Sequence, residues 1–153
     1  MPENRSHPQA ARRNAVRCLL TACALLFGVG ARAAAPDTTD AHRPDRRWFE
    51  AAAAMKRLAE SWGDQSYGAV LILGDALAGE GPSRVIKDRD PAAHAERVAI
   101  HDAQRRLGRT ALAGSILYST SRPCRDCEAA AAQAQVSRMI YGSDLRDAGA
   151  PRP

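Results

Sequence analysis

Blocks of apolar and polar residues alternate along the chain from about residue 45 onward, and each block predicts one secondary-structure element. Apolar residues that recur at helical spacing predict helices, and short continuous apolar runs predict strands. In chain order these are a helix at 45–61, strands at 68–73 and 76–79, a helix at 91–107, a strand at 115–119, a helix at 124–134 and a strand at 138–142. The order α-β-β-α-β-α-β is typical of an α/β domain whose helices are layered on a sheet.

Capping residues mark the predicted ends of the central helix. Asp90 is a predicted N-cap, and Pro91 occupies the first helical position, where its missing N–H costs nothing. Gly108 is the predicted C-cap. The polar segment 80–89 predicts a loop before this helix, and the polar residues from Ser143 onward predict an irregular tail.

The first 33 residues have the pattern of a secretory signal peptide. An arginine-containing polar lead is followed by an apolar run at 18–31 and by a small-x-small cleavage pattern that ends at Ala33. The apolar run is shorter than the roughly 20 residues that span a bilayer, so we expect no stable membrane anchor after cleavage. Arg12 and Arg13 resemble a twin-arginine export signal, with an ordinary secretory signal as the alternative. We therefore expect a periplasmic or secreted protein.

Charge is distributed unevenly between this segment and the rest of the chain. The whole sequence has 22 basic and 17 acidic residues, a net charge of +5. Residues 1–33 hold five arginines and one glutamate, which leaves 17 basic and 16 acidic residues beyond them. The basic balance therefore says little about nucleic-acid binding. We expect a flexible lead at 34–44, a single domain at 45–149 and a short tail at 150–153.

Two cysteines remain after the predicted signal peptide, Cys124 and Cys127, at the start of a predicted helix. Side chains three residues apart share one face of a helix, and the helix N-terminus favours thiolates. In an oxidising compartment, such a pair could form a disulfide or hold a metal ion. A strand followed by Cys-x-x-Cys also occurs in thioredoxin-like proteins, so a periplasmic thiol–disulfide redox protein remains an alternative.

His94 and Glu96 lie two residues apart near the start of the central helix. An imidazole and two thiolates suit zinc, and three protein ligands leave a position open for water, as in catalytic sites. A fourth histidine ligand is not expected, because His101 lies two helical turns, about 10.5 Å, from His94, and His42 lies in the flexible lead. Glu96 is better placed to carry a proton from water to a leaving nitrogen than to bind the metal.

Two short motifs carry a family resemblance, His94-x-Glu96 and Pro123-Cys124-x-x-Cys127. Together they resemble the signature of zinc nucleobase deaminases. The chain is similar to the cytidine deaminase-like superfamily, and in particular to its tRNA adenosine, guanine and cytosine deaminase branch. The resemblance implies a three-layer α-β-α sandwich, Zn²⁺ bound by His94, Cys124 and Cys127, and Glu96 as a proton shuttle. The implied reaction is hydrolytic deamination of a small nucleobase, nucleoside or related amino-heterocycle.

The chain departs from the family pattern around the substrate. The resemblance implies substrate contacts at Ser83 and Ala95, but the family usually has an asparagine where this chain has Ser83. Arg122 stands where glutamate is common, and Asp126 where methionine is common. These changes make the rim of the site more polar and would suit an anionic or unusual substrate.

The expected partner is a small molecule rather than tRNA. Members of the branch that grip tRNA usually continue with further C-terminal helices, and we expect the fold to be shortened there. The export signal also argues against tRNA as the substrate. A catalytically silent zinc-binding domain is a further alternative, and a homodimer is possible because relatives often dimerise.

Overall fold

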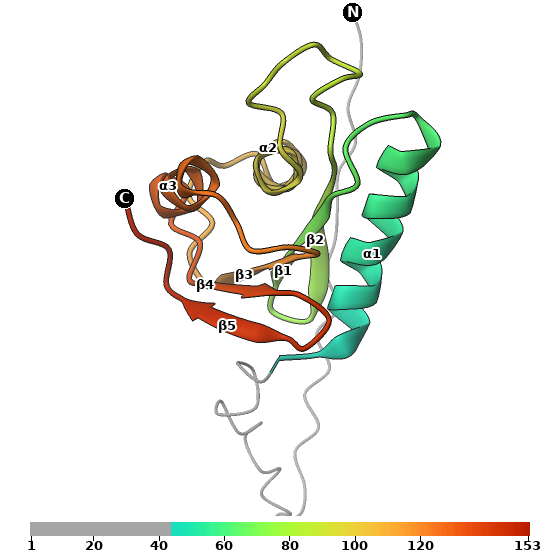
Figure 1. Ribbon diagram of the computed structural model, residues 1–153. Coiled ribbons are helices and arrows are strands. Elements are labelled where there is room, and N and C mark those ends of the chain that lie inside the picture. Colours follow the sequence, from blue (N-terminus) through green and yellow to red (C-terminus); the bar gives the residue numbers. More distant parts are fainter. Residues whose placement is uncertain (1–43) are drawn as a thin grey trace, which may run out of the picture. The chain divides into compact units, whose positions relative to one another are not determined.

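A five-stranded sheet is covered by α1 on one face and by α2 and α3 on the other (Figure 1). The computed structural model describes residues 44–153, so the predicted signal peptide and nearly all of the predicted lead lie outside the described residues. The elements are α1 (Arg46–Ser61), β1 (Gly68–Leu73), β2 (Ala76–Pro82), α2 (Ala95–Leu107), β3 (Ser115–Ser119), α3 (Arg125–Gln133), β4 (Arg138–Tyr141) and β5 (Arg146–Gly149). The predicted three-layer α-β-α sandwich is confirmed. None of these helices has the length and apolar character needed to cross a membrane.

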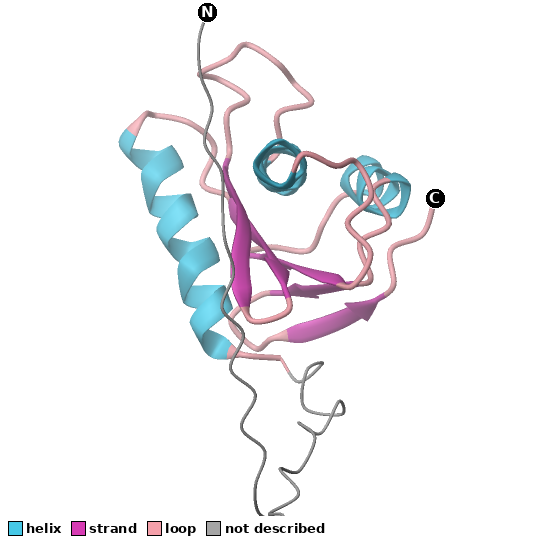
Figure 2. Cartoon of the chain, turned by 180° about the vertical axis from the view of Figure 1, so that it is seen from behind, coloured by secondary structure: helices cyan, strands magenta, loops and turns pink. Residues whose placement is uncertain are grey.

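The sheet is mixed, with strand order β2-β1-β3-β4-β5. β1 pairs antiparallel with both β2 and β3, whereas β3 and β4 are parallel. A parallel pair needs a crossover connection, and α3 supplies it. The chain therefore leaves the end of β3 through a loop and enters α3 on the same side of the sheet as α2, as the reverse view shows (Figure 2).

Apolar side chains of the central strands alternate between two core clusters. Val70 and Ile72 of β1 point toward α1, whereas Ala69 and Leu71 pack under α2 and α3. Both faces are covered, so the strand has an unbroken apolar sequence instead of a polar-apolar alternation. This explains why the run at 68–73 could be identified as a strand from its length and composition.

Two glycines of β2 bring α2 unusually close to the sheet. A Cβ on Gly81 would lie 2.8 Å from the Ala99 side chain and would overlap the Ala95 carbonyl oxygen. A Cβ on Gly79 would overlap the Ala99 carbonyl oxygen in the same way. This close packing fixes the start of α2, where the predicted metal ligand His94 is the N-cap and the predicted proton carrier Glu96 lies in the first turn.

The start of α2 differs from the prediction. The helix begins at Ala95 rather than at Pro91, and His94 is its N-cap, with extended backbone angles. Asp90 caps a preceding turn instead: its carboxylate accepts from the Ala92 N–H at 2.8 Å. An Asp-Pro pair suits a turn as well as a helix start, and the sequence does not separate the two. The predicted end is confirmed, because Gly108 closes the helix in the left-handed conformation.

The sheet is also larger than predicted. β2 extends to Pro82, beyond the predicted end at residue 79, and β5 lies in the segment predicted as an irregular tail. β5 has an exposed sequence without apolar alternation, so no periodicity marked it. It is held by its antiparallel pairing with β4 and by an ion pair between Arg138 and Asp147 across the two strands.

Candidate metal centre and active-site cleft

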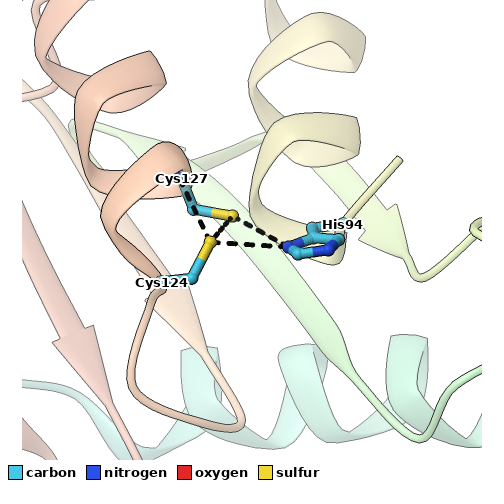
Figure 3. Close-up of side chains that lie close together, drawn as sticks. All are labelled: His94, Cys124 and Cys127. Carbon is cyan, nitrogen blue, oxygen red and sulfur yellow. Dashed lines mark hydrogen bonds between the residues drawn. The ribbon is translucent and has the colours of Figure 1, made fainter. Parts of the chain in front are cut away.

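The predicted metal ligands meet where the N-termini of α2 and α3 come together. His94 is the N-cap of α2, Cys124 is the N-cap of α3, and Cys127 lies in the first turn of α3. Figure 3 shows the imidazole and both sulfurs pointing toward one another. The Cys127 N–H donates to the Cys124 Sγ at 3.3 Å, which fixes the thiol at the helix start. The fold thus brings together residues about thirty positions apart in the chain.

The donor atoms lie close enough together to bind a single metal ion. His94 Nδ1 lies 3.5 Å from Cys124 Sγ and 3.3 Å from Cys127 Sγ, and the sulfurs are 3.0 Å apart. Tetrahedral zinc would separate these donors by about 3.5–3.8 Å, given its usual bond lengths. Both cysteines are free thiols, and their separation is well beyond the roughly 2.05 Å of a disulfide. Within residues 44–153 this metal-binding group comprises three residues, which leaves one tetrahedral position open.

Glu96 lies in the first turn of α2, directly beside this group. Its side chain is buried, with 5% of its surface exposed. Burial raises the pKa of the Glu96 carboxyl above its ordinary value, although interactions with Cys127, His94 and Ser119 oppose that shift. A carboxyl group whose pKa is raised by burial accepts a proton more readily and can pass it on.

The two cysteines differ in their environments. Cys124 is exposed and Cys127 is buried. Burial, followed by the proximity of Glu96, raises the pKa of the Cys127 thiol far above its ordinary value. A coordinated thiol is deprotonated outright by the charge of the metal, so this residue matches a ligand that becomes a thiolate through metal binding.

A cleft of about 410 Å³ opens above these residues. Its walls include Ala95, Glu96 and two of the three metal-binding side chains. The remaining lining residues come from the loops after α1 and β3: Gln65, Tyr67, Ser121 and Arg122. Ala95 therefore lies in the wall of the cleft, between His94 and Glu96, where its small side chain leaves space.

Ser83 lies outside the lining of this cleft. It is completely buried, and its hydroxyl donates to the Asp64 carboxylate at 2.9 Å. Asp64 also accepts from the backbone N–H groups of Gln65, Ile86 and Lys87 at 2.7, 3.0 and 2.8 Å. The hydroxyl of Ser83 is thus used to hold the loop after β2. A contact between Ser83 and the substrate stays a prediction.

Burial alone would raise the pKa of Asp64, and it is the largest single influence on this carboxyl. The hydrogen bonds from Lys87, Gln65, Ser83 and Ile86 together outweigh it, so the pKa of Asp64 lies below its ordinary value. A buried aspartate kept ionised in this way acts as a fixed anchor for the loop. No sequence pattern indicates this role, because it depends on the loops after α1 and β2 meeting around one carboxylate.

Sequence reasoning also missed Gln65, Tyr67 and Ser121, which lie in loops without a motif. Tyr67 is the informative case, because 47% of its surface is exposed although it immediately precedes a buried strand. An exposed aromatic residue beside a strand is a weak signal for a binding surface. His101, by contrast, lies on the exposed side of α2.

Comparisons with known proteins agree with this site. Residues 42–143 match the family described as the cytidine and deoxycytidylate deaminase zinc-binding region. A tRNA-specific adenosine deaminase of Buchnera aphidicola is 31% identical over 103 residues, which cover 67% of this chain and 68% of the relative. The guanine deaminase of Bacillus subtilis is 37% identical over 82 residues, which cover 54% of this chain and 53% of the relative.

Solved structures of proteins with the same two kinds of name are also similar to this chain. A structure from studies of A-to-I editing by tRNA:A34 deaminases is 34% identical, with a TM-score of 0.62, over 64% of this chain and 71% of that one. The Bacillus subtilis guanine deaminase structure is 30% identical, with a TM-score of 0.62, over 65% of this chain and 64% of that one. This chain thus spans roughly half to two thirds of its relatives' length. With the family match over residues 42–143, these likenesses place the chain in the cytidine and deoxycytidylate deaminase zinc-binding family.

Proposed function

We propose that this protein is a zinc-dependent hydrolase that removes the amino group from a small nucleobase, nucleoside or related amino-heterocycle and releases ammonia. One observation carries the proposal: three zinc-type donors converge beside a buried carboxyl group at the base of a cleft. A purely structural zinc site would be closed by a fourth protein ligand, and a redox pair would need no carboxyl group at this position.

In the proposed mechanism, His94, Cys124 and Cys127 hold the metal ion. Zinc bound there supplies a Lewis acid that makes water acidic enough to attack at neutral pH. Glu96 accepts a proton from the attacking water on its carboxylate. As the oxygen bonds to the ring carbon and the carbon–nitrogen bond breaks, Glu96 returns that proton to the departing nitrogen, so that water is consumed and ammonia leaves. Ala95, between two functional residues, leaves room for the flat ring.

The size of the cleft supports a small heterocyclic substrate, since pockets for small molecules begin at about 300 Å³. The similarity to a guanine deaminase supports the same class. Adenosine in tRNA is the second candidate, because several relatives are named tRNA-specific adenosine deaminases. The export signal predicted at 1–33 favours the first candidate. On the same grounds we propose a periplasmic or secreted location; a homodimer stays a prediction.

A substrate screen tests the proposal. Zinc-loaded protein would be incubated with cytosine, adenine, guanine, their nucleosides, pterins and a tRNA anticodon stem-loop, and ammonia would be measured. We expect release from at least one small compound, loss of release after chelation, and recovery when zinc is restored. Release from the stem-loop alone would favour the second candidate.

Two other results would point to the alternatives. Zinc-bound protein that releases no ammonia from any compound would indicate a catalytically silent domain. Metal-free protein with a Cys124–Cys127 disulfide that exchanges with a dithiol would indicate a thiol–disulfide redox protein.

A further inference from the structure

Arg122 lies at the junction of two cavities. It lines the active-site cleft, and it also lines an adjoining hollow of about 470 Å³ to which Arg125 and Arg152 contribute. Arg122 is exposed and immediately precedes the Pro-Cys pair at the start of α3. A molecule whose ring occupies the cleft could therefore extend past Arg122 into the second hollow without leaving the surface of the protein.

Within residues 44–153, the protein offsets the positive charge of Arg122 only through the nearby Glu128. In the part of the chain that the structure describes, Arg122 makes no hydrogen bond or ion pair, although its charge helps to lower the pKa of Glu128. Glu128 itself pairs with Arg152, whose Nε lies 3.0 Å from Oε1. Asp147, the other carboxylate near this rim, pairs with Arg138. The two carboxylates that line hollows together with Arg122, Glu128 and Asp147, are thus each paired with another arginine.

Apart from Arg122, the outer wall of the cleft carries uncharged side chains. The one carboxyl group of the cleft, Glu96, is buried at the base, and the outer wall carries the amide of Gln65 and the aromatic ring of Tyr67. An exposed ring at this place can stack on a flat heterocycle. Ser83 lies outside the lining of the cleft, and its hydroxyl donates to Asp64. Charge at the rim is therefore the strongest recognition element that the cleft offers.

We infer that the substrate is a small amino-heterocycle that carries a phosphate or carboxylate group, and that Arg122 binds this anionic group at the mouth of the cleft. The inference rests on the proposed deaminase function, and it adds the substrate class. A guanidinium presents its N–H donors in a planar fork that matches both anions. Arg125 extends the positive surface into the second hollow, where a longer anionic group would lie.

Pairs of compounds that differ only in the anionic group test this inference. Ammonia release would be measured for adenosine and AMP, cytidine and CMP, guanosine and GMP, and pterin and pterin-6-carboxylate. We expect kcat/KM to be about three- to tenfold higher for the anionic member of the reactive pair, as a bidentate charge-assisted hydrogen bond from an exposed arginine allows. The nucleotide pairs test a preference for a phosphate group, and the pterin pair tests a preference for a carboxylate group.

The Arg122→Gln variant should remove this preference, so that the ratio of the two kcat/KM values falls toward one. Arg122→Lys should restore part of it, because the charge returns without the fork. The matched control is Arg109→Gln, an exposed arginine beyond the end of α2, which should leave the ratio unchanged. A merely structural role of Arg122 would lower both rates together and keep their ratio.

Binding to the zinc-loaded Glu96→Gln variant, measured by calorimetry, separates failure of the inference from failure of the proposed function. Tighter binding of the anionic compound that depends on Arg122, without ammonia release by the wild type, would refute the deaminase function and uphold the inference. Equal kcat/KM values within a reactive pair, unaffected by Arg122→Gln, would refute the inference and leave the function standing. Turnover of an oligonucleotide but of no small compound would also refute the inference about the substrate class.

Discussion

Replacing Asp64 by asparagine removes the anchor of the loop that leads to the metal centre. The Oδ1 atom accepts from the Gln65 N–H and the Ser83 hydroxyl, and Oδ2 accepts from the Ile86 and Lys87 N–H groups. An amide keeps one oxygen and turns the other into a donor. Whichever way the asparagine is oriented, two of the four donors then face an N–H₂ group.

The expected loss of stability follows from these contacts. A hydrogen bond to a charged group contributes about 1.5–3 kcal/mol net to the free energy of unfolding. The loss of two such bonds sets the upper limit of the expected destabilisation. Asp64 is 8% exposed, but Ile86 and Lys87 are exposed, so water can partly replace the protein acceptor for their N–H groups. We therefore expect the free energy of unfolding to fall by about 2–4 kcal/mol.

The pH dependence of the free energy of unfolding gives a second test of the role of Asp64. The pKa of Asp64 is lower in the folded protein than its ordinary value of 3.8, so the folded state favours the ionised carboxylate. Its stabilising contribution is therefore complete above the unfolded-state pKa and is lost as the pH falls through the folded-state pKa. The difference in stability between wild type and Asp64→Asn should be constant near neutral pH and shrink below about pH 4.

Urea unfolding followed by circular dichroism, at pH 7 and at several acidic pH values, measures both effects. Asp144→Asn is the matched control, because Asp144 is exposed and bonds mainly to Arg146; this variant should unfold at nearly the wild-type midpoint. Zinc content should fall in Asp64→Asn, because the Arg84 N–H in the anchored loop donates to the Ala93 carbonyl, next to His94. An Asp64→Asn midpoint equal to that of the control would refute the role assigned to the anchor.

Three further predictions test the packing, the metal ligands and the export signal. Gly81→Ala should lower the free energy of unfolding by about 1–3 kcal/mol, because its Cβ would press on α2, and an unchanged melting temperature would mean that the helix has room to shift. Cys127→Ala should lower zinc content, measured by mass spectrometry, from about one per chain to near zero, whereas the exposed control Ser66→Ala should retain it; equal content in both would remove Cys127 from the ligand set. A reporter fused to residues 1–33 should not be exported in a strain that lacks twin-arginine transport; normal export there would indicate an ordinary secretory signal.

The elements that could be predicted from the sequence are those whose own residues determine them. The apolar run at 68–73 and the glycine cap at Gly108 are local patterns, and this strand and this helix end occur as predicted, whereas the start of the helix does not. β5 has no such pattern, because its position depends on pairing with β4 and on the contact between Arg138 and Asp147. Such an edge strand is defined by its neighbours rather than by its own composition.

In the candidate site, too, some residues could be predicted from the local sequence and others could not. The spacing within each motif placed His94, Cys124 and Cys127 correctly at the starts of two helices, because ligand spacing is a local property. The substrate-facing residues come from loops, where side-chain direction depends on tertiary contacts. Ser83 illustrates the limit: the sequence does not reveal that its hydroxyl is bonded to Asp64, and its contact with the substrate stays a prediction.

Ammonia release by zinc-loaded Glu96→Gln, compared with wild type at equal zinc content, tests the central claim most directly. The substitution keeps the shape of the side chain and all three candidate metal ligands but removes the group that can accept and return a proton. The account predicts that zinc binding persists while ammonia release falls by at least about 100-fold, the lower end of what general acid–base catalysis contributes. Turnover at the wild-type rate by the zinc-loaded variant would contradict the assignment of Glu96 and the mechanism built on it.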